Sequence, residues 1–274
     1  MLKVEKTETY GWEAAIRGMR NPMNSWDKSD TKICDAYQVG ECCDGWVYDT
    51  CPYHDNCENG VWVNEFQSVH LGGNDLDLMK RLRNAGADHR KFMRTIVVYC
   101  DITAPLYWWK EFKTYRSGRK FGDDEPSIMD IIDEGYLEYD IEMNSCSIMH
   151  KIHSKEIMLD DFSYEHLIDN EDLAAYGAEW ITPLDNLMIT ISSLNGAREK
   201  YLETKNKKYW WQMIQLLPSS YNQKRTVMLN YEVLVNMYKS RKRHKLDEWR
   251  TFCDWIETLP YFELIVGGKN NGQV

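Results

Sequence analysis

The sequence lacks any apolar run near the roughly 20 residues that a helix needs to cross a bilayer, so we expect no membrane span. It also lacks an apolar leader, because the first ten residues are polar and mixed in charge, and we therefore expect a cytoplasmic protein. An excess of basic residues is missing too, since the net charge is −10. Bulk binding of DNA or RNA is disfavoured, although a local cluster of Arg and Lys can still bind a small anion.

The eight cysteines include no Cys-x-x-Cys pair, a spacing typical of zinc sites. Five of them fall in one window at irregular spacings, close to His54. The candidate zinc ligands in this window are Cys34, Cys42, Cys51 and Cys57. A loop with free thiols is the favoured alternative, so we expect no metal. His150 and His153 form a second candidate pair, for which exposed or capping histidines are the commoner explanation.

The length is enough for one large domain or two small ones with a well-buried core. Hydrophobic residues make up 43% and charged residues 28% of the 274 positions, which is ordinary for such a domain. We expect a single α/β domain over 1–274 with two irregular insertions. The first, at about 31–73, is rich in cysteine and includes a predicted hairpin around Gly60–Val63. The second, at about 117–143, is punctuated by Gly118, Gly122 and Pro126.

Capping residues, prolines and apolar periodicity predict the regular elements. A β-branched run at Ile96–Tyr99 predicts a buried strand within 94–103. The predicted helices are a short one ending near Pro22, one capped by Asn74 or Asp75 and ending near Asn84, one from Pro105 to about Arg116, and then about Asn170–Ala175, Pro183–Thr204, Lys208–Leu216, Arg225–Arg241 and Lys245–Leu259. The C-terminal third is therefore expected to be rich in helix.

The predicted helix near Arg225–Arg241 carries a polar row. Asn230 and Arg241 are eleven residues apart, close to three helical turns, and Glu248 joins their face if the helix continues. An amide, a guanidinium and a carboxylate in one row suit a polar, nucleotide-like ligand. A solvated helix face with ordinary salt bridges is the alternative on spacing alone.

The segment Leu217–Arg250 resembles the C-terminal motif of the flavin-dependent thymidylate synthase family. That motif has Leu-Pro, a Tyr, then Thr-x-Asn-x-Arg-Ser-Leu-x-Asn-Phe, an Arg, and His-Ala-Gln-x-Glu-Ile-Arg. This chain reads LLPSSYNQKRTVMLNYEVLVNMYKSRKRHKLDEWR. The matching positions are Leu217, Pro218, Tyr221, Asn230, Leu234, Asn236 and Arg241, followed by His244, Glu248 and Arg250 if one residue is missing after Arg241.

A second part of the family pattern lies upstream, in two halves that the 117–143 insertion separates. The kept positions are Ala104, Pro105 and Arg116 in APLYWWKEFKTYR, and Asn144 and Ser147 in NSCSIMH. Glu111 stands at the family's Gln and Tyr115 at its His. His89, after Gly86, resembles the family's Gly-His turn before the strand.

The resemblance implies an α/β fold of the thymidylate-synthase-complementing type, with an antiparallel or mixed sheet and long helices. It also implies a homotetramer that binds FAD at its subunit interfaces. The implied activity is that of a methyltransferase converting the pyrimidine nucleotide dUMP to dTMP, with methylenetetrahydrofolate as carbon donor and NADPH as reductant. The family uses no cysteine nucleophile.

Roles for individual residues follow by similarity. The implied flavin contacts are Asn230, Asn236, His244, Arg116 and Tyr115. Arg241 would lie near the uracil, where a fixed cation stabilises negative charge on a carbonyl oxygen, and Ser147 would lie at the nucleotide. Both are catalytic candidates, and with Glu111 they are the expected substrate-binding residues. Trp108 and Trp109 are expected in the core rather than as a stacking platform.

This chain departs from the family at the arginines that bind the dUMP phosphate. Met149, Ile214 and Glu232 stand at three such positions. The loss of several charge-assisted hydrogen bonds would weaken an unmodified site severely. Possible substitutes at new positions are Lys110, Lys113, Lys151 and Arg119. The basic run Lys239–Arg243 is expected to be a solvated helix end that suits the C-terminal dipole, with a phosphate role as the alternative.

Three functions remain open on the sequence. The first is thymidylate synthesis, and the second is a flavoenzyme acting on another uridine nucleotide. The third is a non-catalytic nucleotide-binding or regulatory module that kept the fold. The replaced arginines favour the second and third, whereas the retained Asn230, Asn236, Arg241 and His244 favour the first and second.

Overall fold

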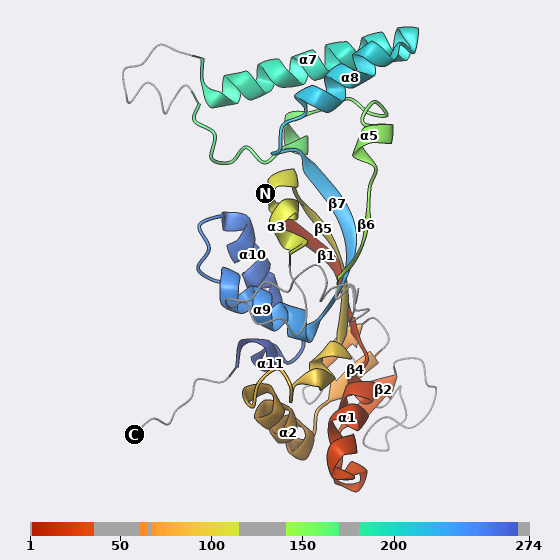
Figure 1. The fold of residues 1–274 in the computed structure, drawn as a ribbon, viewed down its shortest axis with the longest axis vertical. Coiled ribbons are helices and arrows are strands. Elements are labelled where there is room, and N and C mark those ends of the chain that lie inside the picture. The colour runs from red at the N-terminus through yellow and green to blue at the C-terminus, as the bar shows by residue number, and fades with distance from the viewer. Residues whose placement is uncertain (1, 36–60, 65–66, 115–140, 170–180, 268–274) are drawn as a thin grey trace, which may run out of the picture. The chain divides into compact units, whose positions relative to one another are not determined.

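The structure is a computed structural model, and it describes residues 2–35, 61–64, 67–114, 141–169 and 181–267 (Figure 1). The chain divides into two compact units. The hairpin unit, named for its helical hairpin, comprises Met1–Lys3, Ile102–Lys113 and Asn144–Arg225. The α9 unit, named for its central helix, comprises Val4–Asp101, Thr114–Met143 and Thr226–Val274. The single domain expected over 1–274 stays a prediction.

Two sheets lie within the described ranges. The larger has the order β1-β5-β7-β6 and contains β1 (Lys3–Tyr10), β5 (Val97–Pro105), β7 (Asn222–Asn230) and β6 (Glu142–Ser145). The smaller is antiparallel with the order β2-β4-β3 and contains β2 (Lys32–Asp35), β3 (Val61–Asn64) and β4 (Gln67–His70). The β5 strand and the β3–β4 hairpin confirm their predictions. Strand β2, at the start of the insertion expected at about 31–73, was not predicted, and it pairs with β4.

The helices are α1 (Trp12–Arg20), α2 (Gly73–Asn84), α3 (Leu106–Phe112), α5 (Ile148–Lys151), α7 (Pro183–Thr204), α8 (Lys207–Leu216), α9 (Tyr231–Arg241), α10 (Asp247–Ile256) and α11 (Glu263–Val266). Short 3-10 turns lie at η1 (Asn21–Met23), η2 (Trp26–Lys28), η4 (Lys91–Arg94) and η5 (Leu159–Asp161). The predicted helix at Asn170–Ala175 lies outside the described residues. Among the helices that the structure describes, none is long and apolar enough to span a membrane.

In the hairpin unit, α7 and α8 run side by side (Figure 1). The α7 helix begins as predicted because Thr182 and Asp185 form a capping box, each side chain accepting a hydrogen bond from the other residue's backbone N–H. Apolar side chains of α7 pack into a core with Met213 of α8. On α3, Trp108 and Trp109 are 0% and 1% exposed, which confirms that they are core residues.

The α9 unit corrects the predicted helix over Arg225–Arg241. Residues up to Asn230 belong to strand β7, and the helix begins only at Tyr231. Burial along β7 alternates with a period of two, which is typical of a strand, but two of the buried positions are Gln223 and Arg225. Polar residues at inward positions hid the alternation from the sequence. The long helical row expected from Asn230 to Glu248 is therefore wrong, since α9 ends at Arg241.

A buried carboxylate fixes η4 against α9. Glu232 is 0% exposed, and its two oxygens accept hydrogen bonds from two guanidinium groups. The Arg94 Nε lies 2.6 Å from Oε2, and the Arg90 Nε lies 3.4 Å from Oε1. A buried carboxylate needs such partners, because its desolvation is costly. The backbone N–H of Tyr231 donates to the carbonyl of Ile96, which ties the start of α9 to the same segment.

A second buried ion pair joins α1 to α2. The Arg20 Nε donates to Asp75 Oδ1 at 2.7 Å, and both side chains are buried. The other oxygen of Asp75 accepts from the Ser29 hydroxyl and from the backbone N–H groups of Asp30 and Thr31. This network connects the η2 turn to both helices.

The start of α2 lies beside this ion pair between Arg20 and Asp75. The helix starts at Gly73 with Gly72 as its N-cap, so the prediction that Asn74 or Asp75 supplies the cap is wrong. Instead, the carboxylate of Asp30 accepts hydrogen bonds from the backbone N–H groups of both Asn74 and Asp75. The cap thus comes from a residue distant in sequence, because Asp75 is committed to Arg20.

Glu232→Ala should lower the free energy of unfolding by about 3–5 kcal/mol, because it strands two guanidinium groups beside an apolar helix. The matched control is Glu13→Ala, which removes a carboxylate paired with Arg17 at a site where Glu13 is 71% exposed. That change should cost no more than about 1 kcal/mol. Urea unfolding followed by circular dichroism measures both. Equal losses in the two variants would contradict the assignment of Glu232 as a structural counterion.

Asp75→Asn should destabilise the protein in a pH-dependent way. Burial raises the pKa of Asp75, but hydrogen bonds from Thr31, Ser29 and Arg20 outweigh it and lower the pKa below its usual value. A lowered folded-state pKa adds stability above the unfolded value, about 3.9, and that stability is lost as the pH falls through the folded value. We expect a loss of about 3–5 kcal/mol at pH 7 that shrinks below about pH 4. Urea unfolding at pH 7 and pH 3 tests this, and a loss independent of pH would refute it.

Candidate functional site

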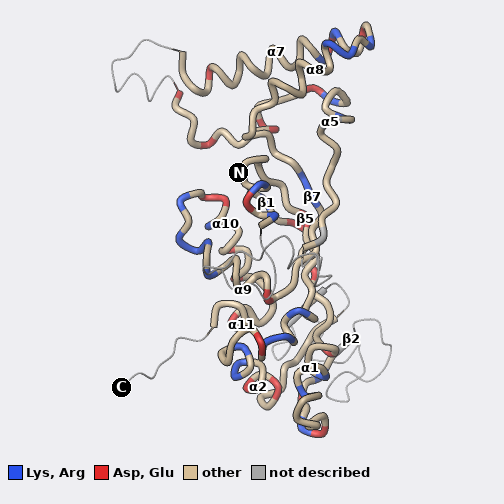
Figure 2. The backbone as a smooth tube through the Cα atoms, in the orientation of Figure 1, with Lys and Arg blue, Asp and Glu red and all other residues tan. Residues whose placement is uncertain are grey.

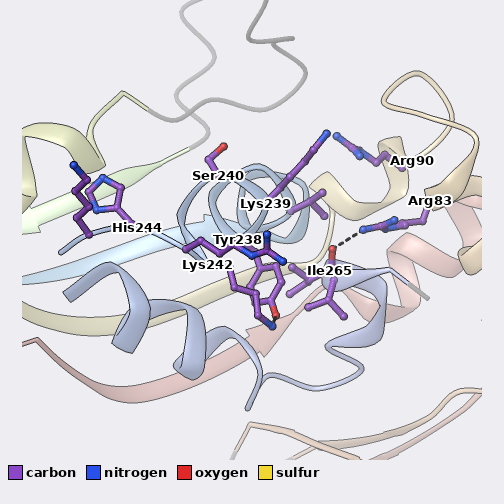
Figure 3. Close-up of a pocket in the computed structure, with 12 residues that line it drawn as sticks. Arg83, Arg90, Tyr238, Lys239, Ser240, Lys242, His244 and Ile265 are labelled. Atoms are coloured by element: carbon purple, nitrogen blue, oxygen red, sulfur yellow. Dashed lines mark hydrogen bonds between the residues drawn. The ribbon is translucent and has the colours of Figure 1, made fainter. Parts of the chain in front are cut away.

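A basic pocket of about 780 Å³ opens beside the C-terminal half of α9, within the α9 unit (Figure 3). Six of its lining residues are cationic, namely Arg83, Arg90, Lys239, Lys242, Arg243 and Lys245. Among the described residues that line it, none is Asp or Glu. Figure 2 shows Lys and Arg concentrated along the connection from α9 to α10, which forms one side of this basic pocket.

Two arginines from outside α9 are held rigidly at one wall. The Nε and Nη2 of Arg83 donate to the backbone carbonyls of Leu264 and Ile265 at 3.1 and 2.8 Å. Arg90 donates through Nε to Glu232 and through Nη2 to Asn236 Oδ1, at 3.4 Å each. Burial lowers the pKa of Arg83, and the nearby positive charge of Arg90 lowers it further. The two guanidinium groups are therefore close enough to repel each other.

One cation of the basic pocket is neutralised internally. The Lys242 ammonium is 2.8 Å from a carboxylate oxygen of Glu257 and also hydrogen-bonds the Tyr238 hydroxyl. Hydrogen bonds to Glu257 and Tyr238 raise the pKa of Lys242. By contrast, Lys239, Arg243 and Lys245 have no ion-pair partner among the described residues. The net charge of the pocket wall is therefore positive.

Trp249 contacts both His244, which was predicted to bind the flavin, and Arg241, which was predicted to lie near the uracil. The ring of His244 lines the basic pocket, lies edge-on to Trp249, and accepts a hydrogen bond from the Leu246 N–H through Nδ1. The neutral ring is thus assigned its proton on Nε2. The guanidinium of Arg241 stacks over the face of Trp249, 4.6 Å from the ring centroid. Arg241 itself does not line the pocket.

The two predicted asparagines have local structural roles. Asn230 is 8% exposed, and its side-chain oxygen caps α9 by accepting from the Val233 N–H at 3.0 Å. Asn236 is partly buried, and its side-chain oxygen accepts from Arg90. Asn236 and His244 are therefore brought to the basic pocket or its wall, whereas Asn230 sits at the opposite end of α9.

The remaining predicted site residues belong to the hairpin unit or lie outside the described residues. Ser147 is exposed and caps α5, its hydroxyl accepting from the His150 N–H at 3.2 Å. Glu111 is partly buried on α3. Tyr115 and Arg116 fall outside the described ranges, so their flavin contacts stay predictions.

The positions of the replaced arginines are structural in this chain where the structure describes them. Ile214 packs against the apolar core between α7 and α8. Glu232 is the buried counterion of Arg90 and Arg94. Of the proposed substitutes, Lys110, Lys113 and Lys151 are exposed side chains of the hairpin unit, and Arg119 lies outside the described residues.

The two buried thiols among the described residues, Cys100 and Cys253, do not suit nucleophilic chemistry. Burial raises the pKa of Cys100 to about 12, with a further contribution from Asp101, and burial likewise raises the pKa of Cys253 to about 12. Both thiols are therefore protonated at neutral pH. Cys42, Cys51 and Cys57 lie outside the described residues, as does the side chain of Cys34. The expectation that these cysteines bind no metal therefore stays a prediction.

Sequence reasoning missed most of the basic pocket. Lys239, Lys242 and Arg243 are exposed at the end of α9, as expected for a solvated helix end, and they also line the pocket with Lys245. Arg83 and Arg90 carry no motif, and they bond to residues of α11 and α9 that are far away in sequence. The charge reversal at Glu232 was the one signal for Arg90, because a buried acid requires a basic partner, and nothing in the sequence signalled Arg83.

No family model matches the sequence, and no curated protein matches it. Among solved structures, Thymidylate Synthase X (ThyX) from Helicobacter pylori with FAD and dUMP is similar over 96% of this chain and 96% of that chain, with a TM-score of 0.55 and 13% identity. A second structure of the flavin-dependent thymidylate synthase ThyX from Helicobacter pylori, complexed with FAD and dUMP, covers the same shares with a TM-score of 0.48 and 14% identity. The mixed α/β architecture of this chain, with antiparallel strands and several helices, is thus that of a ThyX-like fold.

Proposed function

We propose that this protein is a flavin-dependent, thymidylate synthase-like enzyme that converts dUMP to dTMP, with methylenetetrahydrofolate as carbon donor and NADPH as reductant. The observation that carries the proposal is the likeness of fold to a ThyX bound to FAD and dUMP, over nearly the whole of both chains. Two matched positions support it: His244 lines a cationic pocket, and Asn236 accepts a hydrogen bond from Arg90, which also lines it. As in the family that it resembles, we expect a cytoplasmic homotetramer.

The residues present fit a phosphorylated flavin or nucleotide. The basic pocket offers several cations and no carboxylate among its described lining residues, which suits phosphate groups. When bound, FAD would supply hydride transfer. The Nε2–H of His244 can donate to a carbonyl oxygen of the flavin ring, because Nδ1 is occupied by the Leu246 N–H. Stacking on Trp249 fixes the guanidinium of Arg241, which stabilises negative charge that develops on the uracil.

A flavoenzyme acting on another uridine nucleotide is the second candidate. It is favoured by the burial of Glu232 and by the packing of Ile214 against a core. Neither position supplies the arginine that binds the dUMP phosphate in the family that the chain resembles. In that case the flavin site remains, while the phosphate end of the substrate differs. A non-catalytic module with the same fold is the outcome if no flavin binds.

Purified protein incubated with FAD should become yellow and keep its flavin absorption after gel filtration. The matched variant His244→Ala should bind FAD at least about tenfold more weakly, since it loses one donor to a partly desolvated acceptor. Lys28→Ala, a change at an exposed residue of η2, serves as the control. Protein that stays colourless despite correct folding would exclude both flavoenzyme candidates.

Expression in a thymidine-requiring host should restore growth without thymidine. Arg241→Ala should abolish this growth, because it removes the cation proposed to stabilise negative charge on the uracil. The control Arg81→Ala removes the same charge from an exposed position on α2 and should leave growth unchanged. Growth that persists in Arg241→Ala would refute the role of Arg241, and failure of the unmodified, well-expressed and FAD-binding protein would favour another uridine nucleotide.

A further inference from the structure

We propose that Arg83, Arg90 and Lys239 form a phosphate-binding clamp at one wall of the basic pocket, for a phosphate or diphosphate group of a nucleotide. The phosphate chemistry follows from the pocket itself. The choice of a nucleotide rests on the proposed function. The clamp is built from positions that match no part of the family motif described above.

The first argument is the convergence of like charges. Figure 3 shows the side chains of Lys239 and Arg90 pointing toward each other across the same part of the pocket, with Arg83 beside them. No carboxylate among the described residues lines this space. Arg90 already has an anionic partner in Glu232, but Arg94 shares that carboxylate, and like charges that face one another raise the free energy of the empty site. A bound dianion would reduce that cost. Burial lowers the pKa of Arg83 most, and the positive charge of Arg90 lowers it further.

The second argument is that the two arginines are already oriented. The backbone carbonyls of Leu264 and Ile265 hold Arg83, and Glu232 with Asn236 holds Arg90. These bonds use Nε and Nη2 of Arg90 and leave Nη1 with no partner among the described residues. Little side-chain entropy is then lost when a ligand binds. Glu232 is thus a positioning residue, which holds Arg90 at the pocket wall.

The third argument concerns the size of the ligand. A concave pocket of about 780 Å³ falls in the range of small-molecule sites, roughly 300–1,000 Å³. A nucleic acid would need a more extended basic surface, and the net charge of −10 opposes it. A small phosphorylated ligand is therefore favoured over a polyanion.

The test uses the full-length protein and inorganic pyrophosphate as the probe, with isothermal titration calorimetry. Lys239→Ala should weaken pyrophosphate binding at least about tenfold, since it removes one charge-assisted hydrogen bond, and Lys239→Glu should abolish it. Lys80→Ala is the matched control, because it removes the same charge from an exposed helical position on α2. Failure of pyrophosphate to bind, or equal affinity in Lys239→Ala and Lys80→Ala, would overturn the clamp.

Paired ligands then identify the source of the phosphate. If the clamp holds the flavin, Lys239→Ala should weaken FAD more than riboflavin. If it holds the substrate, the variant should weaken dUMP more than deoxyuridine. An equal effect within both pairs would overturn the assignment to a nucleotide. Pyrophosphate binding that depends on Lys239 in a protein that takes up no flavin would sink the proposed function but leave the phosphate clamp standing.

Discussion

The buried carboxylate of Glu232 is the constraint on which the arrangement around α9 depends. A charged group at 0% exposure is tolerated only with partners, so the η4 turn must present Arg90 and Arg94 to the first turn of α9. One carboxylate meets two guanidinium groups, and one of these, that of Arg90, also lines the basic pocket. The charge reversal at position 232 thus removes one cation from a family motif and orients two others.

The polar residues that match the family motif serve the local fold as well as any ligand. Asn230 ends β7 and caps α9, and Asn236 fixes Arg90. Trp249 of α10 holds the side chains of both Arg241 and His244. An unbroken polar row along one helix does not exist, because the chain changes from strand to helix at Asn230. The same residues are instead distributed over a strand end, a helix and the turn that follows it.

What the sequence could predict depends on how local the determining interactions are. The bounds of α7 follow from Thr182, Pro183 and Asp185, which interact within one turn, and prediction and structure agree. The cap of α2 could not be predicted, because it comes from Asp30 across more than forty residues of chain. The basic pocket could not be predicted from the sequence for the same reason, since its cations come from three separate segments. Inward-facing Gln223 and Arg225, which disguised β7, bond to each other and to Trp109.

The position of the cations distinguishes a helix-end effect from a ligand site. Lys239 and Arg241 lie in the last turn of α9, where the partial negative charge of the helix C-terminus stabilises them without any ligand. That explanation does not extend to Arg83 and Arg90, which lie outside α9 and are held beside the pocket by α11 carbonyls, Asn236 and Glu232. A solvated helix end would not require the guanidinium groups of Arg83 and Arg90, which come from other segments, to be held where they repel each other. In an acidic protein, such a local concentration of positive charge would also draw small anions toward the pocket. The described contacts are therefore better explained by an anion site than by the dipole of α9 alone.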